Sequence, residues 1–98
     1  MIYQKQDMEG NFYKWEADPS SMYAGRPSRR LFDRYNGDQV LFVINFYASF
    51  FEAFTIGEAR ELERQIANNL PLEARSEISV FNWIKDVSNK VLDNVEVK

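Results

Sequence analysis

The sequence predicts an α+β domain in which two antiparallel β-hairpins form a small sheet and two C-terminal α-helices pack on one face of it. Three observations lead to this prediction. An Asn-Gly dipeptide stands between two strand-like runs, aromatic and polar residues mix near the N-terminus, and apolar residues recur at helical spacing after Thr55. The 98 residues are expected to form one domain, with residues 95–98 as a frayed tail.

The first hairpin is predicted near the N-terminus. Segments 2–6 and 11–16 are rich in aromatic and polar residues, and residues 7–10 separate them. Gly10 can supply the positive φ that a hairpin loop requires. Residues 18–28 concentrate proline, glycine and serine, which interrupt periodic structure, so we expect a surface loop there.

The second hairpin is predicted around Asn36-Gly37, the dipeptide that type I′ turns prefer because both central residues need φ above zero. Its strands would be residues 29–35 and 38–47. Pairing across a two-residue turn gives the hairpin two faces that both carry apolar side chains. One face holds Leu31, Tyr35, Val40, Phe42, Ile44 and Phe46, and the other holds Phe32, Leu41, Val43, Asn45 and Tyr47 together with Arg30 and Arg34.

The period changes to that of a helix after Phe54. Thr55 and Glu58 match a capping box, in which each side chain bonds a backbone amide at the start of a helix. Apolar residues then recur every three or four positions, and the helix is expected to end at residues 68–69, before Pro71. The apolar positions are Ile56, Ala59, Leu62, Ile66, Ala67 and Leu70.

A second helix is predicted from about Ser79 or Asn82 to Asp93, because apolar residues again share one side. Residues 76–81 fit a short strand before this helix equally well, and the sequence leaves both possibilities open.

The composition gives no support for catalysis. The chain has no cysteine and no histidine, so thiolate nucleophiles, imidazole bases and the usual zinc sites are excluded, and no glycine-rich phosphate loop is present. We therefore expect a non-enzymatic protein without cofactor or metal. The N-terminus does not resemble a signal peptide, and Asn45, Ser49 and Glu52 interrupt the apolar run, so we expect a cytoplasmic protein with no membrane partner.

The second apolar face of the predicted hairpin suggests a function. Antiparallel sheets usually alternate apolar and polar residues, and a continuous apolar patch often marks an interaction site. The lead hypothesis is a protein-binding module of the adaptor or inhibitor type that binds another protein or itself as a homodimer. Its partner-binding residues would be Phe32, Leu41, Val43 and Tyr47, with Arg30 and Arg34 at the rim. The alternative is that the N-terminal hairpin or the loop covers this face, with Tyr13 or Trp15 against it.

A second function is suggested by charge. The net charge is −3, but the stretch 20–37 carries Arg26, Arg29, Arg30 and Arg34 against Asp33 alone. Arginines interleaved with aromatic residues can grip single-stranded nucleic acid or another polyanion. Because the same arginines can also pair with acidic groups on this chain or on an acidic protein partner, nucleic-acid binding is kept as the alternative to protein binding.

Overall fold

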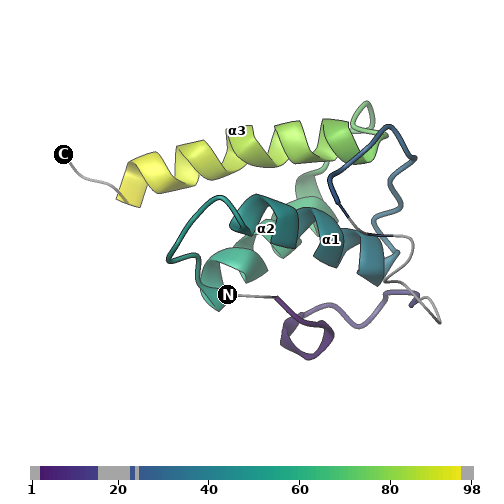
Figure 1. Ribbon diagram of the computed structural model, residues 1–98, viewed down its shortest axis with the longest axis horizontal. Helices are drawn as coiled ribbons and strands as arrows, with labels where there is room; N and C mark the ends of the chain where they lie inside the picture. Colours follow the sequence, from purple (N-terminus) through teal and green to yellow (C-terminus); the bar gives the residue numbers. More distant parts are fainter. Residues whose placement is uncertain (1–2, 16–22, 24, 96–98) are drawn as a thin grey trace.

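In the computed structural model, which describes residues 3–15, 23 and 25–95, the chain is helical (Figure 1). A 3₁₀ turn, η1 (Lys5–Asp7), precedes α1 (Gly37–Ala48), α2 (Ile56–Asn69) and α3 (Glu77–Val95). The described residues contain no β-strand; two isolated bridges, Lys14 with Asn36 and Leu31 with Ser76, are the only β-type pairings there. The predicted α+β class, with its antiparallel sheet, is therefore wrong.

Helix α1 lies at the centre of the molecule. It contacts α2, α3 and η1, and none of its 12 residues is exposed. A helix that is apolar on nearly all sides is expected to be surrounded by other elements. The apolar run from Val40 onward is therefore covered on both sides because it is a central helix and not a strand of a two-faced sheet.

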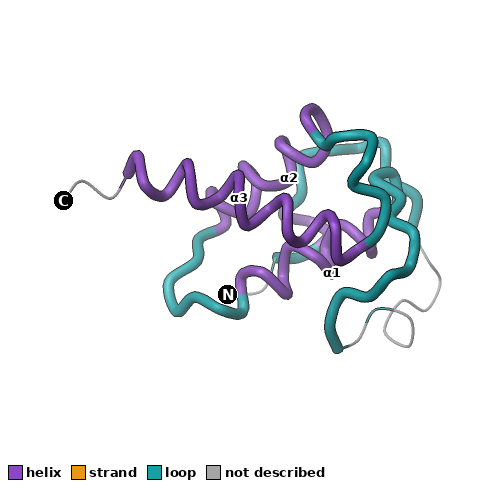
Figure 2. Tube along the Cα trace, turned by 90° about the horizontal axis from the view of Figure 1, so that it is seen from above, coloured by secondary structure: helices purple, strands orange, loops and turns teal. Residues whose placement is uncertain are grey.

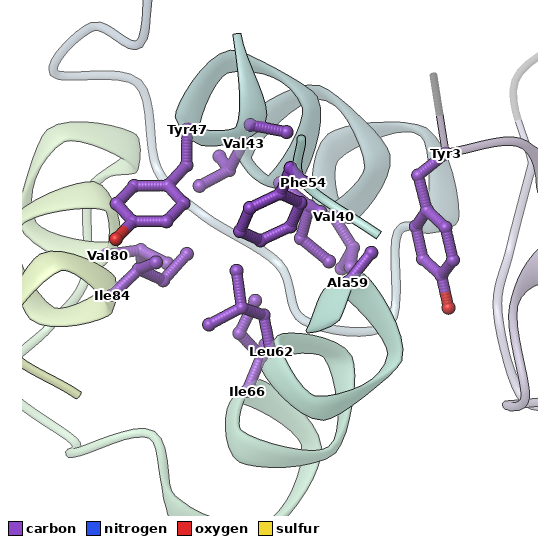
Figure 3. Close-up of a cluster of buried hydrophobic side chains, with 12 residues drawn as sticks. Tyr3, Val40, Val43, Tyr47, Phe54, Ala59, Leu62, Ile66, Val80 and Ile84 are labelled. Atoms are coloured by element: carbon purple, nitrogen blue, oxygen red, sulfur yellow. The ribbon is translucent and has the colours of Figure 1, made fainter. Parts of the chain in front are cut away.

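The core lies where the three helices meet (Figure 3). In α1 the buried apolar residues Val40, Val43, Ile44 and Tyr47 follow helical spacing, so they form one continuous stripe. The remaining buried hydrophobic residues are Tyr3, Ala48, Phe54, Ala59, Leu62, Ile66, Val80 and Ile84. Most of the core comes from α1, α2 and α3, and Figure 3 shows Tyr3 at its edge, beyond Ala59.

The Asn36-Gly37 dipeptide starts a helix and does not form a hairpin turn. Asn36 is the N-cap of α1, and its side chain accepts a hydrogen bond from the Gln39 amide (3.2 Å). Gly37 does not have the positive φ of a type I′ turn. It is needed for space, since a Cβ atom there would lie 2.5 Å from the Trp15 ring. The second predicted hairpin is wrong because asparagine favours helix N-caps as well as turns.

The predicted first hairpin is also replaced by other structure. Residues 5–7 form η1, and Gly10, which lacks a positive φ, donates its amide to Glu63. The two stretches pair with other parts of the chain. Tyr3 donates its amide to Asn45 Oδ1 (2.7 Å) and accepts from Asn45 Nδ2 (2.9 Å), whereas the backbone of Lys14 bonds the Tyr35 carbonyl (2.7 Å) and the Gly37 amide (2.9 Å). The N-terminal part of the chain thus runs along the helices, as Figures 1 and 2 show.

The two C-terminal helices are confirmed. Helix α2 begins after Thr55 with the predicted capping box and ends at Asn69. Helix α3 begins at Glu77, earlier than predicted, so the strand alternative for residues 76–81 is wrong. Most of the predicted loop 18–28 and the tail residues 96–98 lie outside the described residues, while Val95 is the last residue of α3.

Candidate functional site

The structure distributes the predicted partner-binding residues over the core. Val43 and Tyr47 are buried, and the Tyr47 hydroxyl donates to Ser88 Oγ on α3 (2.7 Å). Phe32 and Leu41 are half-buried and pack against the core. The sheet face that these four residues were expected to form is therefore absent from the described part of the chain, and its apolar side chains hold the helices together.

Arg30, predicted as a rim residue, is partly exposed and is bonded to the buried Glu77. The fully buried Glu77 carboxylate accepts hydrogen bonds from Arg30 Nε (2.8 Å), from Gln39 Nε2 (2.8 Å) and from the Ser28 amide (3.0 Å). The Arg30 guanidinium also lies over the Tyr23 ring, 4.7 Å from its centroid. This network attaches the segment before α1 to the start of α3.

The other three arginines of the predicted anion site do not converge with Arg30. Arg34 Nη1 donates to the main-chain oxygens of Ala67 (3.1 Å) and Ile66 (3.4 Å), so it binds carbonyls in the last turn of α2. Arg26 and Arg29 are exposed. Two of the four predicted anion-binding arginines therefore serve the fold, and two remain on the surface.

A second buried carboxylate, Glu63 on α2, binds the N-terminal segment. It accepts hydrogen bonds from the hydroxyls of Tyr3 (2.6 Å) and Tyr13 (2.7 Å) and from the amides of Glu9 (3.1 Å) and Gly10 (2.9 Å). Burial, followed by the hydrogen bond to this carboxylate, raises the pKa of both tyrosine hydroxyls well above the ordinary value. Because backbone and side-chain donors occupy Glu63, its role is to position the chain.

The described residues contain no cluster of three or more carboxylate, histidine or cysteine side chains that could hold a metal ion. No helix within the described ranges is long and apolar enough to cross a membrane.

A cluster of aromatic side chains reaches the surface where α1 ends. Phe46 of α1 and Phe81 of α3 meet edge to face, with ring centroids 5.3 Å apart, and Phe50 contacts both rings from the turn after α1. Phe51, the next residue, packs against Tyr47, with ring centroids 5.0 Å apart. Phe50 is 64% exposed and Phe51 42%. We call Phe46, Phe50, Phe51, Phe81 and Lys85 the aromatic surface.

A hollow of about 280 Å³ opens within the aromatic surface. Its walls are Tyr47, Phe50, Phe51, Phe81 and Lys85. The Lys85 ammonium lies over the Phe81 ring, 5.3 Å from the centroid, and exposed Glu52 follows Phe51 on the turn. The surface therefore combines an apolar hollow with one basic and one acidic side chain.

The sequence contained a signal for this surface that the strand interpretation hid. Phe50 and Phe51 are adjacent in a short connection between two helices, where only a few residues can turn inward. Two neighbouring large rings in such a turn are expected to leave at least one exposed. The predicted strand ended at residue 47 and the predicted helix began after Phe54, so the residues between them were not analysed for exposure and this surface was missed.

A second hollow, of about 290 Å³, lies between α2 and α3. Phe54, Leu62 and Val87 supply its apolar wall, and Glu58 and Glu61 stand at its edge. Glu58 closes the capping box of α2, while Glu61 pairs with Arg64 (2.6 Å). Both carboxylates are bonded within α2. Neither is therefore directed at a ligand in this hollow.

Comparison with known proteins gives no further guidance: no family model, no curated protein and no solved structure matches this chain.

Proposed function

We propose that the chain is a small, non-enzymatic protein-binding module that self-associates through the aromatic surface. The observation that carries this proposal is the joint exposure of Phe50 and Phe51 beside an apolar hollow. Leaving a phenylalanine in water forfeits about 1.5 to 3 kcal/mol relative to burial. Adjacent exposed rings on a small domain are typical of a contact surface.

A second copy of the chain fits this surface in shape. The same patch carries a projecting ring, Phe50, and a hollow. In a two-fold dimer both partners use the same patch, so the Phe50 ring of each copy can enter the hollow of the other. A surface with a projection and a recess side by side is therefore complementary to itself.

The charges at the aromatic surface also suit a two-fold contact. Glu52 lies on the turn that carries Phe50 and Phe51, and Lys85 lies on α3. When two copies meet about a two-fold axis, Glu52 of one copy can approach Lys85 of the other. This attraction favours the two-fold arrangement over other orientations of the two copies.

Sedimentation velocity at micromolar concentration tests the proposal. We expect the wild type to sediment as a dimer and the double variant Phe50→Ser, Phe51→Ser as a monomer, because the variant removes the exposed rings of the patch. Circular dichroism checks that the variant stays folded, since Phe51 also contacts the core residues Tyr47 and Phe54. Leu72→Ser is the matched control, since Leu72 is also highly exposed but lies in the connection between α2 and α3. A monomeric wild type, or a double variant that dimerises as the wild type does, contradicts the proposal.

A charge exchange tests the register. Glu52→Lys and Lys85→Glu are each expected to weaken the dimer, because like charges then face each other across the two-fold axis, and the double exchange is expected to restore it. Circular dichroism of each variant reports on folding. Failure of the double exchange to recover any association would contradict the arrangement of Glu52 against Lys85.

A further inference from the structure

A second group of exposed side chains lies at the start of α3, within one turn of Phe81, and consists of other residues than the aromatic surface. There the segment 28–32 runs antiparallel to the chain that enters α3 (Figure 1). The amide of Phe32 donates to the Arg75 carbonyl (2.7 Å), and the amide of Glu77 donates to the Arg30 carbonyl (2.9 Å). The bridge between Leu31 and Ser76 lies between these two bonds.

The geometry of this pairing decides which side chains reach solvent. Successive side chains of an extended chain point to opposite sides. Arg30 and Phe32 point inward, where Arg30 bonds Glu77 and Phe32 packs on the core. Arg29 and Leu31 therefore point outward; Arg29 is exposed, and Leu31 is 75% exposed.

The far edge of the segment is already occupied. Gln39 of α1 donates Nε2 to the Leu31 carbonyl (2.8 Å), and its Oε1 accepts from the Asp33 amide (2.8 Å). The side-chain amide of Gln39 thus takes the place of a neighbouring strand. Addition of a partner strand at this edge is excluded, and recognition here has to use the outward side chains.

The connection before α3 carries further exposed side chains. Leu72 is 84% exposed and Ile78 44%, and Arg75, also exposed, donates Nε to the Leu72 carbonyl (3.4 Å). We call Arg29, Leu31, Leu72, Arg75 and Ile78 the basic edge. The large apolar side chains of this edge are among the most exposed in the described part of the molecule.

Charge indicates the kind of partner. Arg29 and Arg75 are exposed on the basic edge, and Arg26 adds a third exposed arginine shortly before it. Of the carboxylates within residues 70–78, Glu73 is exposed, whereas Glu77 is buried and bonded to Arg30. The surface is therefore positive on a chain whose net charge is −3. Leu31, which follows two arginines in the chain, is complementary to an apolar residue flanked by carboxylates, whereas Leu72 is followed by the acid Glu73.

We propose that the basic edge binds an acidic amphipathic helical segment of a partner protein. The apolar residues of that segment would contact Leu31, Leu72 and Ile78, and its carboxylates would meet Arg29 and Arg75. The guanidinium group of arginine holds its N–H donors in a plane that matches the two oxygens of a carboxylate. The contact is therefore directional as well as attractive.

The experiment uses fluorescence anisotropy of the full chain with a labelled peptide of about four helical turns, built from Glu, Leu and Ala with the leucines on one face. The same peptide with Lys in place of Glu is the charge control. We expect the acidic peptide alone to bind, with an affinity that falls as salt is raised. Leu31→Ser should weaken binding about tenfold, and the double variant Arg29→Glu, Arg75→Glu should abolish it.

Phe50→Ser is the matched control, because it removes an exposed apolar side chain from the aromatic surface and should leave peptide binding unchanged. Equal binding of the Lys peptide would overturn the proposal. So would binding of heparin as tight as that of the acidic peptide with no effect of Leu31→Ser, because the edge would then be a general polyanion site. Loss of the dimer in Leu31→Ser would also overturn it, since the edge would then be a contact between copies.

Discussion

Two buried carboxylates, Glu63 on α2 and Glu77 on α3, hold the irregular N-terminal part of the chain against the helices. Each accepts bonds from backbone amides as well as side chains, so each replaces hydrogen bonds that regular structure would otherwise supply. A buried carboxylate is tolerated only when its oxygens are well bonded. The described buried side-chain polar atoms all have partners, in agreement with this requirement.

The tyrosines bound to Glu63 should make the fold sensitive to alkaline pH. The pKa of Tyr3 and that of Tyr13 are raised in the folded state by burial first and by the Glu63 carboxylate second. The unfolded chain loses these protons near pH 10, whereas the folded chain keeps them to higher pH. Stability from these groups is therefore complete well below pH 10 and is lost progressively as the pH rises above about 10.

The measurement is urea unfolding of the wild type and of Tyr13→Phe between about pH 8 and pH 11. We expect the variant to lose one hydrogen bond at neutral pH, about 1 kcal/mol, and to show a shallower loss of stability above about pH 10. Tyr35→Phe removes an exposed phenol that is not bonded to Glu63 and serves as the control. An alkaline loss in Tyr13→Phe as steep as that of the wild type would contradict this account.

At the scale of elements, the start of α1 depends on a contact between Gly37 and Trp15. A methyl group at Gly37 would lie 2.5 to 2.6 Å from three ring carbons of Trp15. We expect Gly37→Ala to destabilise the fold by about 1 to 3 kcal/mol through overcrowding. In the background of Trp15→Ala the same substitution should be neutral or stabilising, because alanine is the better helix former.

A double-mutant cycle measured by urea unfolding gives the coupling between the two sites. Gly57→Ala is a useful control, since Gly57 lies in the first turn of α2 and a Cβ there would meet its nearest neighbour at 3.8 Å. If Gly37→Ala costs the same with and without Trp15, then the ring is not the reason for glycine at this position.

The comparison of α1 with α2 explains what the sequence could predict. Helix α2 has an apolar side and a charged side, so its helical period and its capping box could be recognised in the sequence, and its predicted bounds were correct. Helix α1 is apolar at nearly every position because neighbours surround it, so both a period of two and the helical spacing of Val40, Val43, Ile44 and Tyr47 fit. The segment is rich in β-branched and aromatic residues, which are common in strands, and it follows an Asn-Gly dipeptide, which is common in hairpin turns. These two features led to the prediction of a strand.

The same error affected the candidate site. In a strand every second side chain points the same way, whereas in a helix every third or fourth does. Reading the segment as a strand therefore put four residues that pack in or against the core on an exposed sheet face: Phe32, Leu41, Val43 and Tyr47. The bonds of Arg30 and Arg34 to Glu77 and to the end of α2 join segments far apart in the chain, which no local pattern reveals. The exposure of Phe50 and Phe51 follows from the helix–turn–helix path of residues 37–69, so it could be inferred only once α1 was recognised as a helix.

At the scale of the whole molecule, the described N-terminal residues lie along one side of a three-helix core (Figure 1). Side chains on all three helices hold them: Asn45 and Gln39 on α1, Glu63 on α2 and Glu77 on α3. The aromatic surface and the basic edge lie at different positions on this body, one where α1 ends and one at the start of α3. They approach each other on α3, where Ile78 of the basic edge lies one turn before Phe81 of the aromatic surface.

Self-association should make thermal stability depend on protein concentration. If the folded chain dimerises and the unfolded chain does not, mass action stabilises the folded state as concentration rises. For a domain of this size, a gain of about 1 kcal/mol raises the melting temperature by about 4 to 8 °C. A hundredfold increase in concentration should therefore raise the wild-type melting temperature by several degrees, measured by calorimetry above the dissociation constant.

The variant Phe50→Ser, Phe51→Ser should melt at one temperature throughout, whereas Leu72→Ser should follow the wild type. A wild-type melting temperature that does not change with concentration would mean that the exposed phenylalanines are not covered by a second copy.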